Sequence, residues 1–125
     1  MEHSKKAVVE NIINLIMITP EDFQKVDIRV GKIIGVEKLP NAKYSTHKLT
    51  IDFGEEIGKK KSCARVIQYT DEQLMGKLII AVLNFPPKQI GQNMSEVLTL
   101  GLPGEDGECV LVSPDKGVPL GGKLY

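Results

Sequence analysis

The fold is decided by the stretch VDIRVGKIIGVE, residues 26–37. Its apolar and charged side chains fall on opposite parities, with Val26, Ile28, Val30, Ile34 and Val36 on one and Asp27, Arg29 and Glu37 on the other. This period of two predicts a half-buried strand of about a dozen residues. Gly31 and Gly35 interrupt it, and glycine inside a strand marks a bulge or a sharp bend. A long first strand bent in the middle can be shared by both sides of a small barrel.

The residues that follow predict the rest of that barrel. Leu49, Ile51 and Phe53 alternate with polar residues in a second strand, and a third strand is predicted around residues 60–67. A capping box at residues 70–73 predicts a short helix before the apolar run 78–83, and a fifth strand is predicted at residues 97–100. The order strand, strand, strand, helix, strand is typical of a five-stranded OB-fold Greek-key barrel. We therefore predict an all-β fold with a C-terminal β extension at residues 109–112, and only turns from residue 114 onward.

The N-terminal segment predicts an amphipathic helix. Between Lys5 and Ile18 the apolar residues recur at three- and four-residue spacing, and they are Val8, Val9, Ile12, Ile13, Leu15 and Ile16. A new helix start follows at Thr19, with Pro20 at the first position and Asp22 completing a capping box. We divide the chain into an N-terminal helix, residues 1–18, and a barrel domain, residues 19–125. Because a long exposed apolar stripe is a liability, we expect the stripe to be buried in a homodimer or against its own barrel.

Charge is neutral overall but unevenly distributed. Ten bases and five acids lie between Phe23 and Val66, so this segment carries a surplus of +5 and the remainder of the chain an equal deficit. Such an asymmetry can steer a polyanion to one face of a neutral protein, although a solvated lysine-rich surface would give the same pattern.

Catalytic, metal and membrane functions have little support in the sequence. Cys63 and Cys109 are distant from each other, and the two histidines, His3 and His47, have no metal-ligand spacing, so we predict no metal site and no cofactor. A GxxxxGK match ending at Lys123 is followed by Leu124, not by the Ser or Thr that a phosphate-binding loop requires. With no nucleophile motif, membrane-spanning run or secretory signal, we expect a non-catalytic cytoplasmic protein.

Five long runs resemble the CsaA branch of the tRNA-binding-domain family, which also includes the C-terminal appendage of methionyl-tRNA synthetases. The runs are VDIRVGKI (26–33), LTIDFGEEIG (49–58), VLNFPPKQIG (82–91), MSEVL (94–98) and VPLGGKL (118–124). The resemblance covers the chain from about Thr19 to Tyr125. It implies an OB-fold homodimer that binds tRNA by shape, and for the CsaA branch an export-related chaperone role on unfolded peptides.

Two segments depart from that family. Its loop after the first strand is of the His-Pro-Asn-Ala-Asp-Lys type, whereas this chain reads LPNAKYSTHK at residues 39–48, so no contact of that loop is carried over. The Ser-Glu-Gly-Met element of the family appears here as SEVL, residues 95–98, which keeps the serine.

Candidate binding residues come from strand parity and from the resemblance. Lys61 and Arg65 share a parity on the third strand and could meet phosphates, or could simply form a solvated face. The resemblance adds Asn84, Lys88 and Ser95, with Asn84 alternatively capping a turn. Arg29 and Lys123 complete the set. Phe85 could stack on a base, but the chain has few aromatic residues and we expect Phe85 to be part of the core. We therefore expect shape and backbone recognition to exceed base reading.

Two functions remain open after this reading. In the first, the basic face of a homodimer binds tRNA; in the second, an apolar groove binds unfolded or preprotein peptides. Their salt dependence separates them, because phosphate contacts release counterions and apolar burial does not.

Overall fold

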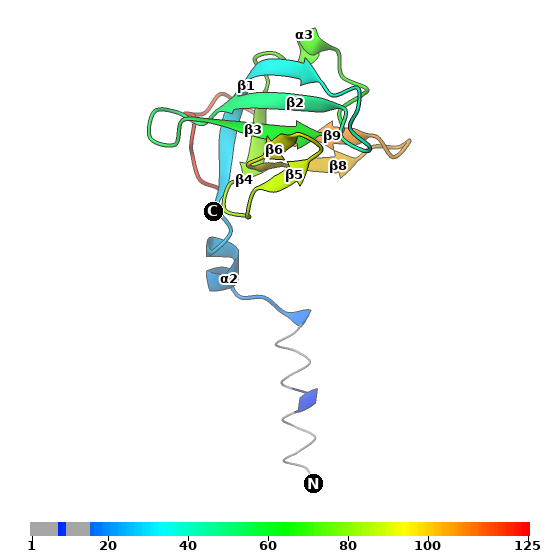
Figure 1. Cartoon of the computed structure of the whole chain (residues 1–125). Helices are drawn as coiled ribbons and strands as arrows, with labels where there is room; N and C mark the ends of the chain where they lie inside the picture. Colours follow the sequence, from blue (N-terminus) through cyan, green and yellow to red (C-terminus); the bar gives the residue numbers. More distant parts are fainter. Residues whose placement is uncertain (1–7, 10–15) are drawn as a thin grey trace.

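The computed structural model describes residues 8, 9 and 16–125 of the 125-residue chain. It is mostly β, with a five-stranded antiparallel sheet that curls into a nearly closed barrel (Figure 1). The strands are β1 (Ile28–Lys38), β2 (His47–Asp52), β3 (Lys59–Ala64), β4 (Leu78–Val82), β5 (Lys88–Ile90), β6 (Asn93–Ser95), β7 (Leu98–Thr99), β8 (Gly101–Pro103) and β9 (Cys109–Leu111). Two short helices, α2 (Pro20–Gln24) and α3 (Asp71–Leu74), complete the secondary structure between residues 16 and 125. The predicted OB-type barrel is confirmed.

Strand β1 is shared by the two halves of the barrel, as the glycines predict. The sheet order is β3-β2-β1-β4-β7, with residues 28–32 of β1 pairing with β4 and residues 32–38 pairing with β2. The register with β2 shifts between Ile33 and Gly35, which is the predicted bulge. A Cβ on Gly31 would lie 2.5 Å from Ile51 Cγ2, so only glycine lets β1 pass this close to β2.

Side-chain contacts close the barrel between β3 and the β7 end. The buried Ser62 hydroxyl on β3 lies 3.1 Å from the Val97 carbonyl and 2.8 Å from Thr99 Oγ1. Strand β7 pairs with β4 through only two residues, and the next residue, Leu100, bonds Ile80 O of β4 through its amide at 2.9 Å. The fifth strand is therefore shorter than the four residues predicted.

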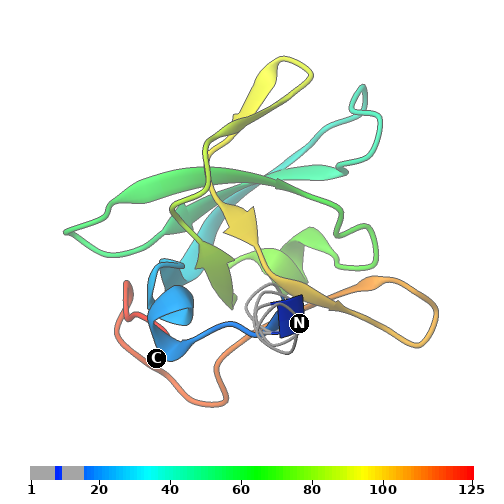
Figure 2. The same ribbon diagram turned by 90° about the horizontal axis from the view of Figure 1, so that it is seen from below.

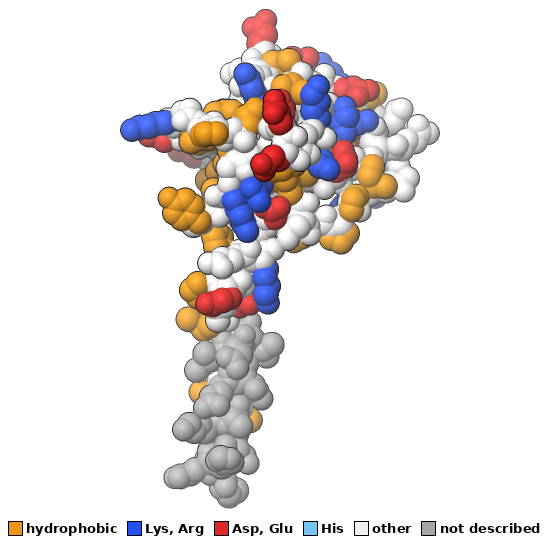
Figure 3. Space-filling view, turned by 90° about the vertical axis from the view of Figure 1, so that its left-hand side faces the viewer, with side chains coloured by type: hydrophobic (Ala, Val, Ile, Leu, Met, Phe, Trp, Pro, Cys, Tyr) orange, Lys and Arg blue, Asp and Glu red, His pale blue; other side chains and the backbone are white. Residues whose placement is uncertain are grey.

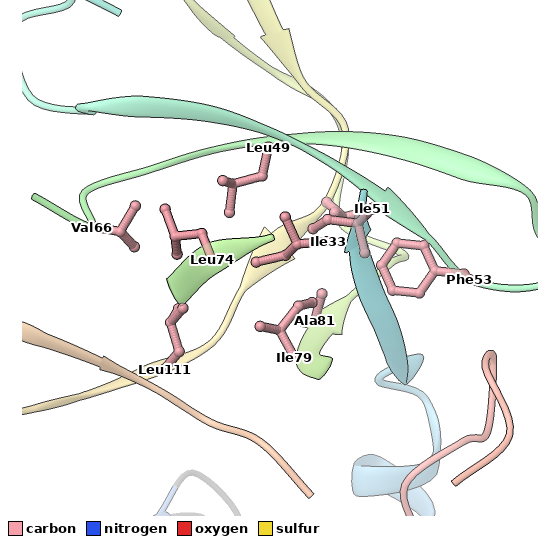
Figure 4. Packing of buried hydrophobic residues seen from close by; sticks show 10 residues of the cluster. Ile33, Leu49, Ile51, Phe53, Val66, Leu74, Ile79, Ala81 and Leu111 are labelled. Atoms are coloured by element: carbon pink, nitrogen blue, oxygen red, sulfur yellow. The ribbon is translucent and has the colours of Figure 1, made fainter. Parts of the chain in front are cut away.

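The interior of the barrel holds the main core (Figure 4). Leu49 and Ile51 from β2, and Phe53 just after it, meet Ile33, Ile79 and Ala81 from β1 and β4. Leu74 of α3 caps one end. Each of these side chains is at most 1% exposed. Burial of apolar area in this cluster supplies the main driving force for the fold.

A second apolar cluster lies on the opposite face of β1 and β4. It contains Ile28, Val30, Ile80 and Val82, and Leu100 and Val112 pack against it. The single apolar face predicted for residues 26–36 is therefore wrong, since Ile28 and Val30 point away from the barrel interior that Ile33 occupies. Alternation reveals two faces of a strand but not which of them is inside.

The C-terminal segment forms more than the predicted turns. It runs beside the beginning of β1, with hydrogen bonds from Gly121 N to Val30 O (2.9 Å) and from Leu124 N to Ile28 O (2.9 Å). Figure 2 shows this segment passing next to α2 on the lower side of the barrel. The predicted β extension at residues 109–112 is present as β9, paired with β8.

Both predicted capping boxes are confirmed. Thr19 accepts a hydrogen bond from Asp22 N, and the Asp22 carboxylate accepts one from Thr19 N. The bond from Thr19 N to the carboxylate is the main reason that the pKa of the Asp22 carboxyl lies below its usual value. Thr70 and Gln73 make the equivalent pair at α3.

Most of the predicted N-terminal helix lies outside the described residues. Of its apolar stripe, Val8, Val9 and Ile16 are helical, and their exposed fractions are 56%, 54% and 73% in the single chain. Within the described residues, no helix is long and apolar enough to cross a membrane.

Candidate nucleic-acid interface

The outer face of strands β2 and β3 carries Lys61, one of the cationic candidates, in a row with other lysines. In the antiparallel register, Thr50 lies opposite Lys61 and Lys48 lies opposite Cys63. Leu49, Ile51 and Ser62, on the alternate parity, are fully buried. The outward row therefore consists of Lys48, Thr50 and Asp52 on β2 and Lys59, Lys61 and Cys63 on β3. We call this surface the β2–β3 face.

Lys61 is held in place on this face by its backbone. Its amide donates to the Glu96 carboxylate at 2.9 Å, and its carbonyl accepts from Glu96 N at 2.8 Å. The exposed ammonium donates to Thr50 Oγ1. An ammonium has three donors, so two remain for a ligand such as a phosphate oxygen.

The β5–β6 hairpin borders the β2–β3 face. Lys48 Nζ donates to Asn93 Oδ1 at 3.1 Å, which joins β2 to the hairpin turn. Lys88 is exposed on the outer strand of the hairpin, opposite Ser95. In Figure 2 the hairpin and the β1–β2 loop project to the same side of the barrel. The face thus lies between two projecting loops, the arrangement through which OB folds bind oligonucleotides.

Arg65 lies one residue beyond β3 and contacts Tyr44 of the β1–β2 loop. Its Nη1 donates to the Tyr44 carbonyl at 3.1 Å, and its guanidinium carbon lies 5.4 Å from the Tyr44 ring centroid. Both side chains are exposed. The arginine therefore has most of its five donors available while its position is defined by the loop.

Ser95 has a structural role. Its hydroxyl accepts a hydrogen bond from Cys63 N at 3.0 Å and donates to the Val97 carbonyl at 3.2 Å. These two bonds tie β6 to β3 and use the hydroxyl that a ligand would need.

Arg29, Asn84 and Lys123 cluster at the beginning of β1, away from Lys61. Arg29 pairs with the Asp27 carboxylate and donates to the Gly121 carbonyl at 2.9 Å. Asn84 bonds the backbone of Asp27 and Lys25, while Lys123 bonds the Gln24 carbonyl at 3.1 Å. The structure brings Lys61, Arg65 and Lys88 to the β2–β3 face or its borders. In contrast, Arg29, Asn84 and Lys123 connect the C-terminal segment and the end of β4 to the entry of β1.

Two aromatic side chains differ from expectation. Phe85 is 51% exposed, so its predicted place in the core is wrong; it follows the last core position of β4 in a proline-rich turn. Tyr44 was not among the predicted residues, yet it is 75% exposed beside Arg65. The signal for it was a lone aromatic residue in a lysine-containing loop. The β5–β6 hairpin was also missed, although residues 90–93 carry the Gly-containing turn that marks a hairpin.

Basic and acidic side chains are mixed on one side of the molecule (Figure 3), and both thiols have raised pKa values. Figure 3 shows lysine and arginine side chains interspersed with acids on one side of the molecule, so the basic surplus does not form an unbroken patch there. Burial raises the pKa of the Cys63 thiol, with the Lys48 ammonium opposing the shift, and burial also raises the pKa of Cys109. Within the residues that the structure describes, no three His, Cys, Asp or Glu side chains gather as metal ligands would.

Similar structures share this fold over most of the chain. The CsaA chaperone protein of Picrophilus torridus is 49% identical with a TM-score of 0.81, and the match covers 87% of this chain and 100% of that one. The chaperone CsaA of Bacillus anthracis is 40% identical with a TM-score of 0.79, covering 87% and 99%.

Curated relatives are much longer proteins. The methionine–tRNA ligase of Pyrococcus horikoshii is 40% identical over 110 residues, which make up 83% of this chain but 14% of the ligase. The profile of the putative tRNA-binding domain matches residues 28–123, from the first residue of β1 to the C-terminal segment. The chain therefore belongs to the family of putative tRNA-binding domains.

Proposed function

We propose that this protein binds tRNA without catalysing a reaction, through the β2–β3 face and the two loops beside it. One observation carries the proposal: in a chain of the tRNA-binding family, exposed Lys61, Arg65 and Lys88 lie on or beside a single outer face. Ammonium and guanidinium groups bind phosphate oxygens as point charges and forks, respectively. Contacts of this kind recognise the shape and backbone of RNA.

The acids of the face do not oppose this assignment. Asp52 lies opposite both Lys32 and Lys59, so its charge is flanked by two cations. Its carboxylate accepts a hydrogen bond from Gly54 N at 2.9 Å. A ligand phosphate therefore meets a face on which the carboxylate of the outward row, at the end of β2, is already engaged.

We further propose that the working form is a cytoplasmic homodimer. Val8, Val9 and Ile16 are more than half exposed in the single chain, and a second copy would remove such a stripe from water. Two β2–β3 faces in one assembly would also allow avidity on a folded RNA.

Salt dependence tests the tRNA proposal. The double variant Lys61→Ala/Lys88→Ala should flatten the slope of log affinity for mixed tRNA against log salt by about 1.4 to 1.8, since each phosphate contact contributes roughly 0.7 to 0.9. Adding Arg65→Ala should bring the change to about 2 to 3. All tRNAs should weaken alike, because phosphate contacts carry no direct sequence information.

A matched control removes two charges elsewhere. Lys25→Ala/Lys116→Ala changes the net charge equally but takes the lysines from the α2 cap and the C-terminal segment. It should leave the slope nearly unchanged. Equal slopes for both double variants would refute the β2–β3 face as the binding surface.

The second candidate function is binding of unfolded peptides. It is favoured by the two CsaA chaperone structures and by an open cavity of about 560 Å³ whose lining includes exposed Ile67, Leu98 and Leu102. An unfolded peptide that binds with little salt dependence, while tRNA fails to bind at any salt concentration, would establish this function in place of the first.

A further inference from the structure

An open cavity of about 880 Å³ lies between the β1–β2 loop, the residues after β3 and helix α3. This volume is within the roughly 300–1,000 Å³ of small-molecule sites. Its lining includes Lys38, Lys43, Tyr44, His47, Arg65 and Tyr69. The cavity therefore combines cations with aromatic rings.

Tyr44 presents an unusually accessible ring in this cavity. It is 75% exposed, and the one cation over it, Arg65, covers part of the ring at 5.4 Å. Tyr44 and Arg65 also line the neighbouring cavity of about 560 Å³, so the pair stands between the two hollows. A flat ligand can stack on the remaining ring surface.

The loop that carries Tyr44 is held in a defined conformation. Leu39 N bonds Thr46 O at 2.9 Å, which closes the loop on itself, and Thr46 N bonds Ala64 O at 3.0 Å. The Thr46 hydroxyl contacts His47 Nδ1 at 2.8 Å and accepts from Val66 N at 2.9 Å. Anchoring of this kind lowers the entropy lost when a ligand binds.

The cavity is lined by cations at one end and by acids at the other. Lys38, Lys43 and Arg65 are at the loop end, while Asp71 and Glu72 line the cavity from α3. An anionic group is therefore favoured beside the loop and disfavoured beside the helix. Lys43 is on the same loop as the Tyr44 ring, and Arg65 contacts that ring from the end of β3, so a ligand with a flat part and an anionic part next to each other fits.

We propose that this cavity binds one unstacked nucleotide, with its base on the Tyr44 ring and its phosphate beside Lys43 and Arg65. The proposal rests on the proposed function, because RNA supplies the nucleotide. It adds a base contact beside the β2–β3 face, which is otherwise suited to recognition of the RNA backbone. It concerns a loop in which this chain departs from its family's pattern. A free mononucleotide offers the same chemistry as a single-stranded residue of RNA.

Two substitutions of Tyr44 test the stacking. Tyr44→Ala removes the ring but keeps the backbone carbonyl that accepts from Arg65, so the loop should remain anchored. It should weaken binding of a short single-stranded oligoadenylate about 5- to 150-fold, the range that base–aromatic stacking gives. Tyr44→Phe keeps the ring and should bind like the unmodified protein. Tyr125→Ala removes a fully exposed tyrosine elsewhere and serves as the control.

Three probes identify the source of the nucleotide. Adenosine monophosphate, the oligoadenylate and a blunt RNA duplex of the same length are titrated at one salt concentration. If the oligoadenylate binds more tightly than the monophosphate and depends on Tyr44, the ligand is a nucleotide of single-stranded RNA; equal affinities identify a free mononucleotide. The duplex should be insensitive to Tyr44→Ala.

Three results would overturn the proposal. The first is an oligoadenylate affinity that Tyr44→Ala leaves unchanged, and the second is a loss of affinity in Tyr44→Phe equal to that in Tyr44→Ala. The third is binding of an unfolded peptide that depends on Tyr44 while RNA binding does not. Failure of the tRNA proposal is seen separately, because the salt slope of tRNA responds to Lys61 and Lys88 and not to the neutral Tyr44. If Lys61→Ala/Lys88→Ala leaves the tRNA salt slope unchanged while oligoadenylate binding depends on Tyr44, the tRNA face is refuted and the nucleotide cavity is kept.

Discussion

Asn84 bonds the backbone of Asp27 across the junction of β1 and β4, with Asn84 Oδ1 accepting from Asp27 N at 2.8 Å. The same amide donates through Nδ2 to the Lys25 carbonyl at 2.6 Å. One side chain at the end of β4 thus satisfies two backbone groups at the entry to β1. Its oxygen and its nitrogen both bond the backbone of the fold, whereas the Lys61 ammonium makes one hydrogen bond within the protein and keeps two donors for a ligand.

Asn84→Ala should therefore lower the free energy of unfolding by about 1 to 3 kcal/mol, because two backbone groups lose their partners. Urea denaturation followed by circular dichroism measures the change. Asn84→Asp keeps an acceptor for Asp27 N and loses the donor, so its free energy of unfolding should lie between those of the unmodified protein and Asn84→Ala. A folded, fully stable Asn84→Ala variant with a reduced affinity for tRNA would instead place Asn84 in the binding site.

Arg29 should act on the C-terminal segment. Its guanidinium bonds the Gly121 carbonyl, and the neighbouring Gly121 and Leu124 amides bond the backbone of β1. Arg29→Ala should accelerate hydrogen exchange at these two amides, since their segment loses its side-chain anchor. Arg29→Gln, which retains a side-chain donor, should exchange more slowly than Arg29→Ala. Unaltered exchange in the alanine variant would show that the backbone bonds suffice.

Gly31→Ala should destabilise the barrel. The added Cβ would meet Ile51 Cγ2 at 2.5 Å and Phe53 Cε1 at 2.7 Å, both in the core. Overpacking of this kind costs about 1 to 3 kcal/mol. Gly117→Ala is the control, because nothing lies within 4 Å of a Cβ there. Thermal unfolding of both variants checks the prediction, and equal midpoints would contradict it.

Cys63 and Cys109 should alkylate slowly. Burial raises the pKa of both thiols, so near neutral pH the reactive thiolate is scarcer than in an exposed cysteine. The rate with iodoacetamide should rise as pH increases toward and beyond the raised pKa, and should match that of a free thiol once urea unfolds the chain. Cys63→Ser and Cys109→Ser separate the two sites. A folded-state rate equal to the unfolded rate at neutral pH would contradict the prediction.

The proposed homodimer predicts that charge in the apolar stripe separates the subunits. Val8→Asp/Ile16→Asp places two charges on side chains that are exposed in the single chain, so folding of the barrel should persist. Burying these charges at an interface would be costly, and the variant should therefore be monomeric. Sedimentation equilibrium at micromolar concentration compares it with the unmodified chain. An unmodified chain that sediments as a monomer would refute the dimer.

Local patterns in the sequence by themselves determined the barrel. The alternation and glycines of residues 26–37 predicted a shared, bulged β1, and Thr19 and Thr70 predicted both helix starts, because these features depend on neighbours within a few residues. Lys61, Arg65 and Lys88 were likewise found from strand parity and family resemblance. Their exposure follows from the alternation or from the loop that carries them, although their contact with RNA remains a prediction.

Only the tertiary structure decided which candidates are free to bind. The Arg29 side chain bonds the backbone of Gly121, 92 residues away, and the Asn84 side chain bonds the backbone of Asp27, 57 residues away. No local pattern could show these contacts. Ile28 and Val30 were predicted to share one apolar face with Ile34 and Val36, because a period of two cannot tell that residues 100–124 would cover the outer face of β1. The pairing of Tyr44 with Arg65 likewise depends on a loop meeting the exit of β3, and contacts between distant residues are made by the fold and not by their neighbours in the chain.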